Sequence, residues 1–283
     1  MNLSHKSIKT PGEGSPGLKD VLVKYYPWLV ISFCAFFLFY KYILQVSPSV
    51  MTQELMSYFN VGGVGLGNLA AAYFYTYLVV QIFAGPLLDK YSPRLLMMGA
   101  VFISAIGIFE FSRASTLSHA LFSRGLIGAG AAFATVGYLK MAAVWFKPRQ
   151  FAFVAGLLAT AAMIGSMAGQ VPLALMVGHF GWQESLMYIG FFGFLLSLAF
   201  FIFVRDNKEK PVAIRLEKAT HHLKWRDFLE VLKHKHNWLL MFYGGFSFSP
   251  VAVFGGLWGN PFLEEAYHIT RKQAATLTSM IFL

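Results

Sequence analysis

The chain has 283 residues, of which 57% are hydrophobic and only 13% are charged. A soluble globular domain carries about 25% charged residues, so this composition excludes an ordinary soluble domain and predicts a polytopic membrane protein. The net charge of +10 does not indicate a nucleic-acid-binding protein, because the basic residues gather in alternate connections between apolar stretches.

Several classes of function are excluded by what the sequence lacks. No G-x-x-x-x-G-K-[ST] stretch is present, so no loop is predicted to cradle ATP phosphates. The single cysteine, Cys34, permits no disulfide within the chain. The histidines within residues 221–236 lie among lysines, which favours a solvated loop over a metal site. We predict no enzyme, no cofactor and no metal centre.

Residues 1–24 are polar and predict a disordered tail. Apolar stretches long enough to cross a bilayer follow. The predicted spans are residues 28–46, 63–86, 94–112, 119–144, 151–177, 183–204 and 238–258. An eighth begins near residue 271, and the sequence ends within it at Leu283.

Charge in the connections predicts the orientation of the chain. Lysine and arginine gather in the tail and after the second, fourth and sixth spans, whereas the other connections carry only Arg113, Arg271 and Lys272. The positive-inside rule therefore places the N-terminus in the cytoplasm.

Each of the first two spans carries three residues, most of them polar, at four-residue spacing. This spacing places the three residues of a span on one helical face. These residues are Phe37, Lys41 and Gln45 in the first span, and Tyr73, Tyr77 and Gln81 in the second. A charge inside a span normally faces a cavity or a partner, although a lysine near a span end also snorkels outward. Hydroxyls and an amide on one face orient a small polar ligand, and ordinary packing produces the same pattern.

A charged hairpin, Gly85 to Arg94, follows the second span and is predicted as a loop in which Asp89 precedes the next helix, with Pro93 in its first turn. It resembles the signature G-x-x-x-D-[RK]-x-G-[RK]-[RK] of the major facilitator superfamily. The matching residues are Gly85, Asp89, Lys90 and Arg94, whereas Ser92 and Pro93 depart from the pattern. The resemblance implies that these four matching residues form a conformational latch.

The third span offers Glu110 near its outer end, the one acidic residue predicted to be partly immersed, and hence a candidate for proton coupling. The alternatives are a coupling group in the missing half and coupling to something other than protons. In the fourth span, Arg124 precedes a run of small residues that resembles a second signature of the same family. Small residues allow close helix packing. Arg124 either faces a polar cavity or snorkels.

The fifth span carries Gly156, Gly165 and Gly169, which resemble half of the family's antiporter signature, but Gln170 intervenes before the proline. Packing explains these glycines equally well. At the end of the seventh span, Trp258 and Asn260 either close a cavity on the outer side or anchor the span at the interface.

The resemblance implies an all-α membrane bundle made of two six-span halves. The predicted divisions are the tail 1–24, the first half 25–204, a cytoplasmic joining loop 205–237, and the start of an incomplete second half 238–283. The rest of that half comes from the same full-length chain or from an unknown partner. The family members are secondary transporters that work by alternating access.

Two cations in one cavity repel unless an anion lies between them, so Lys41, Arg124, Tyr73, Tyr77 and Gln81 are the candidate substrate ligands. The expected substrate is a small carboxylate-bearing solute, such as an amino acid, peptide or organic acid, moved with protons across a bacterial inner membrane. The alternatives are a drug or metabolite exporter, a seven-span receptor, and a truncated remnant that does not transport.

Overall fold

The computed structural model describes residues 18–206 and 233–283, and every regular element in these two ranges is helical. In chain order the elements are α1 (Leu18–Val46), η1 (Ser47–Val50), α2 (Thr52–Phe59), α3 (Gly63–Lys90), α4 (Pro93–Ser112), α5 (Leu117–Trp145), α6 (Pro148–Ala168), α7 (Val171–Phe180), α8 (Trp182–Phe203), α10 (Lys235–Pro250), η3 (Val251–Trp258), α11 (Gly259–Tyr267), α12 (Arg271–Ser279) and η4 (Met280–Phe282).

Among the described residues, seven helical stretches are long and apolar enough to cross a membrane, which confirms the predicted number of complete spans. Helix α1 begins at Leu18, so the last part of the predicted tail is helical, contrary to the expectation. Helix α12 begins at Arg271, where the eighth span is predicted to start. The rest of the tail, and most of the predicted joining loop, lie outside the described residues.

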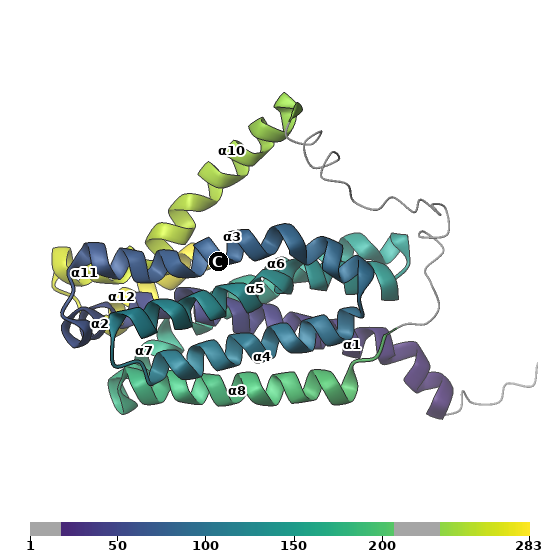
Figure 1. Cartoon of the computed structure of the whole chain (residues 1–283), viewed down its shortest axis with the longest axis horizontal. Helices are drawn as coiled ribbons and strands as arrows, with labels where there is room; N and C mark the ends of the chain where they lie inside the picture. Colours follow the sequence, from purple (N-terminus) through teal and green to yellow (C-terminus); the bar gives the residue numbers. More distant parts are fainter. Residues whose placement is uncertain (1–17, 207–232) are drawn as a thin grey trace, which may run out of the picture.

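Helix α5 is central to the first part of the bundle and packs along α3, α4 and α1 (Figure 1). Its small residues make this approach possible. A Cβ atom on Gly128 would lie 2.1 Å from the carbonyl oxygen of Tyr73, and one on Gly130 would lie 2.4 Å from that of Ala100. Backbone-to-backbone approach of this kind is how membrane helices associate without a hydrophobic driving force.

The connection between the second and third spans is shorter than predicted. Helix α3 continues through Gly85 and Asp89, so only Tyr91 and Ser92 separate it from α4. Most of the stretch predicted as a charged loop is therefore the last turns of a helix.

The start of α4 is capped differently from the prediction. Pro93 occupies the first turn as expected, and the Ser92 hydroxyl accepts a 3.2 Å hydrogen bond from the Leu95 amide. Asp206 accepts a 3.2 Å bond from the amide of Arg94. The carboxylate at this helix N-terminus is therefore that of Asp206, not that of Asp89.

Two of the spans are interrupted. The fifth is divided between α6 and α7 at Gly169 and Gln170, where Pro172 enters the first turn of α7. Proline has no N–H to donate into a continuous helix, so a break is expected there. The seventh consists of α10, the π-helical segment η3 and α11. Such breaks in membrane helices are tolerated where other protein groups satisfy the backbone.

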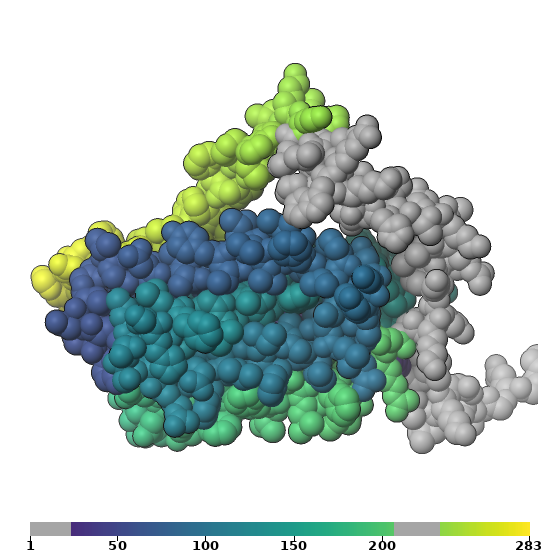
Figure 2. All heavy atoms as spheres, viewed as in Figure 1, coloured from purple at the N-terminus to yellow at the C-terminus, as the bar shows by residue number. Residues whose placement is uncertain are grey.

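The bundle has two distinct ends. We call the "α2 end" the one where η1, α2, α11 and α12 gather, and the "basic end" the one that carries the turn between α3 and α4 and the turn between α5 and α6 (Figure 1). Contacts between the first six spans and the later elements lie at the α2 end. Helix α10 has no buried side chain, and Figure 2 shows it standing away from α3.

Candidate functional site

Arg124 is a fully buried cation on the central helix α5. Its Nη1 donates a 2.8 Å hydrogen bond to the carbonyl oxygen of Leu44, and its guanidinium carbon lies 5.3 Å from the centre of the Tyr73 ring. Its Nε and Nη2 atoms are buried and have no hydrogen-bond partner among the described residues. Arg124 therefore points into the protein interior and does not snorkel.

Lys41 is the second buried cation, with only 4% of its surface exposed. Its Nζ lies 3.8 Å from the centre of the Tyr42 ring and 5.3 Å from that of the Tyr77 ring. Cation–π contacts of this kind stabilise an ammonium that has lost water. No ion pair of Lys41 occurs within the described part of the chain.

The aromatic residues of α3 connect the two cations. The rings of Tyr73 and Tyr77 stack with their centres 5.9 Å apart. The Tyr73 hydroxyl donates a 3.4 Å hydrogen bond to Oε1 of Gln45. The structure thus brings Tyr73 and Tyr77 of α3 together with Lys41 of α1 and Arg124 of α5. We call these four residues the cationic cluster.

Gln81 lies further along α3, towards the basic end. Its side chain is partly exposed overall, and its buried Oε1 has no hydrogen-bond partner among the described residues. No hydrogen bond of Gln81 to either cation is present in the described part of the structure. Its predicted role as a ligand therefore stays a prediction.

The two buried cations are not matched by a buried acid. No aspartate or glutamate is buried in residues 24–206 or 233–283. The ion pairs among the described residues are His119–Glu110, Lys140–Asp89 and Arg271–Glu54, and all lie towards the two ends of the bundle. Positive charge inside a span is costly unless something compensates it, so this core is suited to an anion.

Glu110 lies apart from this cluster, in the last turn of α4. Its Oε2 is 3.1 Å from Nε2 of His119, and the His119 and Glu110 side chains are 34% and 41% exposed. The coupling role of Glu110 stays a prediction.

Three of the four residues predicted as a latch make contacts within the first six spans. Lys140 on α5 pairs with Asp89 at 2.5 Å, and Lys90 lies over the ring of Tyr91 at 5.4 Å. The Nη2 of Arg94 donates a 2.5 Å bond to the carbonyl oxygen of Phe201 on α8. Gly85 has open space around it, because a Cβ there would meet nothing within 4 Å.

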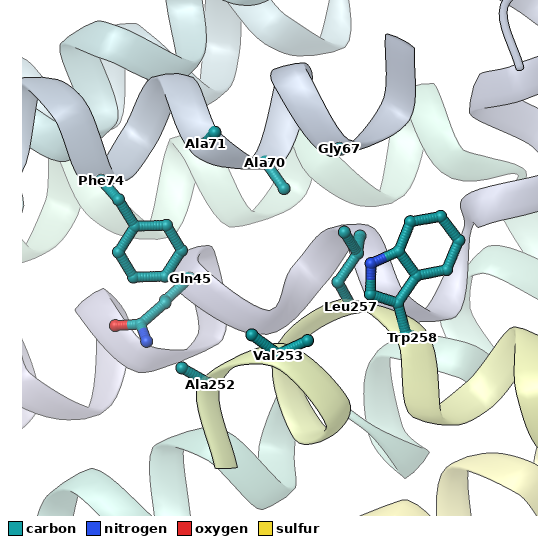
Figure 3. Close-up of a pocket in the computed structure, with 10 residues that line it drawn as sticks. Gln45, Gly67, Ala70, Ala71, Phe74, Ala252, Val253, Leu257 and Trp258 are labelled. Carbon is teal, nitrogen blue, oxygen red and sulfur yellow. The ribbon is translucent and has the colours of Figure 1, made fainter. Parts of the chain in front are cut away.

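A cavity of about 210 Å³ lies between α1, α3 and η3 (Figure 3). Its walls are mainly apolar and include Ala70, Phe74 and Leu257. The Gln45 amide also lines this cavity, and the same amide accepts the hydrogen bond from Tyr73. Gln45 thus links the cavity to the cationic cluster.

Gln45 and Tyr42 contact the cluster although neither is a predicted ligand. The available signal was the position of Gln45 one turn after Lys41 on the same helical face. Tyr42 follows Lys41 directly in the chain, so spacing alone gives no reason to expect its ring beneath the ammonium.

The glycines of the fifth span have a packing role. A Cβ on Gly165 would lie 2.5 Å from the carbonyl oxygen of Phe39, and one on Gly169 would lie 2.4 Å from Val46. Gly156 has nothing within 4 Å. Close approach to α1 thus accounts for Gly165 and Gly169 without a role in export.

Comparisons with known proteins agree with this architecture. The sequence profile of the Major Facilitator Superfamily matches residues 28–283. The solved structure of a bacterial homologue of the human lysosomal transporter Spinster, inward-facing and unoccupied, aligns with a TM-score of 0.70 and 17% identity, over 90% of this chain and 60% of that one. This likeness concerns the fold.

Curated relatives match part of their own length. The uncharacterized transporter YybO of Bacillus subtilis is 24% identical over 74% of this chain and 44% of its own length. The probable L-galactonate transporter of Escherichia coli is 23% identical over 86% and 55%, and the probable sulfoacetate transporter SauU of Cupriavidus necator is 22% identical over 61% and 40%. The chain spans about half the length of the curated relatives it matches.

Proposed function

Because the chain belongs to the Major Facilitator Superfamily, a family of membrane transporters and not of enzymes, we propose that it acts in secondary transport of a small carboxylate-bearing solute. The solute binds in the core of the bundle, and access alternates between the two sides of a bacterial inner membrane. The N-terminus and the basic end face the cytoplasm.

The observation that carries this proposal is the state of Arg124. It is fully buried, its Nε and Nη2 have no partner among the described residues, and no buried acid accompanies it there. A guanidinium presents its donors in a planar fork that matches a carboxylate. Lys41 supplies a second charge, and Tyr73 and Tyr77 supply an aromatic wall.

The relatives support an acidic substrate class. Their names refer to L-galactonate, sulfoacetate and galactarate or D-glucarate, all of which carry acidic groups. These names describe those proteins. For this chain they favour an organic acid over a neutral or cationic solute.

We also propose that transport of the solute is coupled to protons, and that the Glu110–His119 pair accepts the proton. The pair is partly exposed and joins the last turn of α4 to the first turn of α5. A second half of the transporter, from the same full-length chain or from a partner, completes the cavity.

The test is ligand-induced thermal stabilisation of the purified protein with a panel of solutes. The panel contains galactonate, sulfoacetate and amino acids, and galactitol serves as a control that lacks the carboxylate. A ligand at about 100 times its Kd stabilises a protein by about 2.7 kcal/mol. We expect stabilisation by at least one carboxylate and none by galactitol, with loss of the effect in Lys41→Ala and Arg124→Ala.

Exposed cations provide matched control variants. Arg113 and Lys147 are exposed and lie outside the cluster, so Arg113→Ala and Lys147→Ala keep the response to the carboxylate. Unchanged stabilisation in both Lys41→Ala and Arg124→Ala would show that the carboxylate binds elsewhere.

A further inference from the structure

Three uncharged polar side chains are buried together at the α2 end, where helices break. Ser49 lies in η1, Gln170 lies at the break between α6 and α7, and Asn260 lies in the first turn of α11. Gln170 and Asn260 have no exposed surface, and Ser49 has 1%. With the carbonyl group of Gly255 they form what we call the amide cluster.

Hydrogen bonds join the members of the amide cluster. The Asn260 Nδ2 donates to Oε1 of Gln170 at 2.8 Å and to Oγ of Ser49 at 3.3 Å. The Gln170 Nε2 donates to the carbonyl oxygen of Gly255 at 2.7 Å and to Oγ of Ser49 at 3.1 Å. Gln170 is therefore hydrogen-bonded to both η3 and α11.

The amide cluster occupies positions where the backbone itself is irregular. Gly255 lies within the π-helical segment η3. The π-helix is rare in proteins, and where it occurs it is often at a functional site. Gln170 stands between Gly169 and Pro172, where the fifth span is divided into α6 and α7. At both breaks, a backbone or side-chain group forms a hydrogen bond between the first six spans and the later elements.

A charged layer lies beside the amide cluster at the same end. The Arg271 guanidinium pairs with the Glu54 carboxylate, and the Gln53 amide donates to Glu264 at 3.5 Å. The Arg271 and Glu54 side chains are 28% and 29% exposed, so solvent and salt reach them. The amide cluster is uncharged and sealed from water, so salt does not screen it.

The first six spans and the later elements therefore contact each other at the α2 end and diverge towards the basic end (Figure 1). Helix α10, on the diverging side, has no buried side chain. We propose that Gln170, through the amide cluster, is the gate residue that keeps the α2 end closed. Opening to that side requires its bonds to Asn260 and Gly255 to break. This inference rests on alternating access in the proposed function, but its test needs no substrate.

The test measures access to a reporter thiol in η3, between the two residues of that segment and α11 that join the amide cluster. Leu257 is 7% exposed and lines the cavity of Figure 3, so Leu257→Cys in a Cys34→Ala background supplies a single thiol. A membrane-impermeant maleimide is applied from each side of membrane vesicles. We expect Gln170→Leu, which keeps the volume but removes the bonds, to speed labelling from the α2 side by roughly fivefold to thirtyfold.

The matched control is Gln183→Leu, because Gln183 is an exposed glutamine in the first turn of α8. It leaves the labelling rate unchanged. High salt also leaves the rate of the parent protein unchanged, and a rate that rises with salt would make the charged layer the gate and contradict the proposal. Equal labelling rates in Gln170→Leu and its parent, with equal thermal unfolding temperatures, would overturn the proposal.

If the Gln170→Leu protein does not fold, a second measurement tests the same proposal with a different variant. Ser49→Cys with Asn260→Cys replaces two neighbouring members of the amide cluster with a crosslink that a reductant reverses, and labelling at position 257 is read by peptide mass. We expect the oxidised protein to resist labelling at Leu257→Cys and the reduced protein to label quickly. Fast labelling of the oxidised protein contradicts the proposal, whatever solute the protein binds.

Discussion

The Nη1 of Arg124 donates a 2.8 Å hydrogen bond to the carbonyl oxygen of Leu44, and this bond joins the central helix α5 to the last turn of α1. It fixes one side of the guanidinium, while Nε and Nη2 have no partner among the described residues. The arginine is thus oriented before any ligand arrives, which reduces the entropy lost on binding.

Arg124→Leu is expected to remove the response to carboxylate while leaving the ligand-free protein as stable as before or more stable. The reason is that a buried charge without a counterion opposes folding, and apolar replacement of buried charges is often neutral or favourable. Thermal unfolding with and without the carboxylate measures both effects. Arg113→Leu is the control, and a variant at position 124 that is strongly destabilised and still binds contradicts the prediction.

Gly128→Ala is expected to destabilise the protein by about 1–3 kcal/mol, because the added methyl would lie 2.1 Å from the Tyr73 carbonyl oxygen. Gly85→Ala is the matched comparison. Its methyl meets nothing within 4 Å, and alanine in a helix interior is favoured over glycine by about 0.5–1 kcal/mol. Denaturation should give a lower free energy of unfolding than the parent for Gly128→Ala and a higher one for Gly85→Ala. Equal effects of the two substitutions would be inconsistent with this packing.

The Asp89–Lys140 pair is expected to contribute little to stability. The Asp89 side chain is 62% exposed, so water screens the attraction despite the 2.5 Å separation. A double-mutant cycle with Asp89→Asn and Lys140→Gln should give a coupling energy of about 0.2–1 kcal/mol. A much larger coupling would mean that the pair is shielded from water in the membrane.

Glu110→Gln is expected to abolish accumulation driven by a pH gradient and to leave exchange of substrate across the membrane intact. An amide keeps the size of the carboxylate but cannot accept a proton from His119 or water. Uptake into proteoliposomes with and without a gradient separates the two activities. Glu184→Gln, at an exposed acid of α8, is the control, and gradient-driven accumulation that persists in Glu110→Gln refutes the assignment.

The sequence by itself determined the number of spans and most of their positions. This was possible because a bilayer requires each segment to satisfy its own backbone, so a span is a local property of about 20 apolar residues. It also identified Arg124 and Lys41, since a charge within an apolar run is visible without any knowledge of packing.

Tertiary structure alone decided what these residues contact. The ring of Tyr42 beneath Lys41, the Gln45 amide between Tyr73 and the cavity, and the bond from Asn260 to Gln170 join residues whose approach depends on how the helices cross. Asp206, and not Asp89, lies at the start of α4 for the same reason. Periodicity gives the face of one helix, but the partner of that face is set by the close packing of backbones at residues such as Gly128.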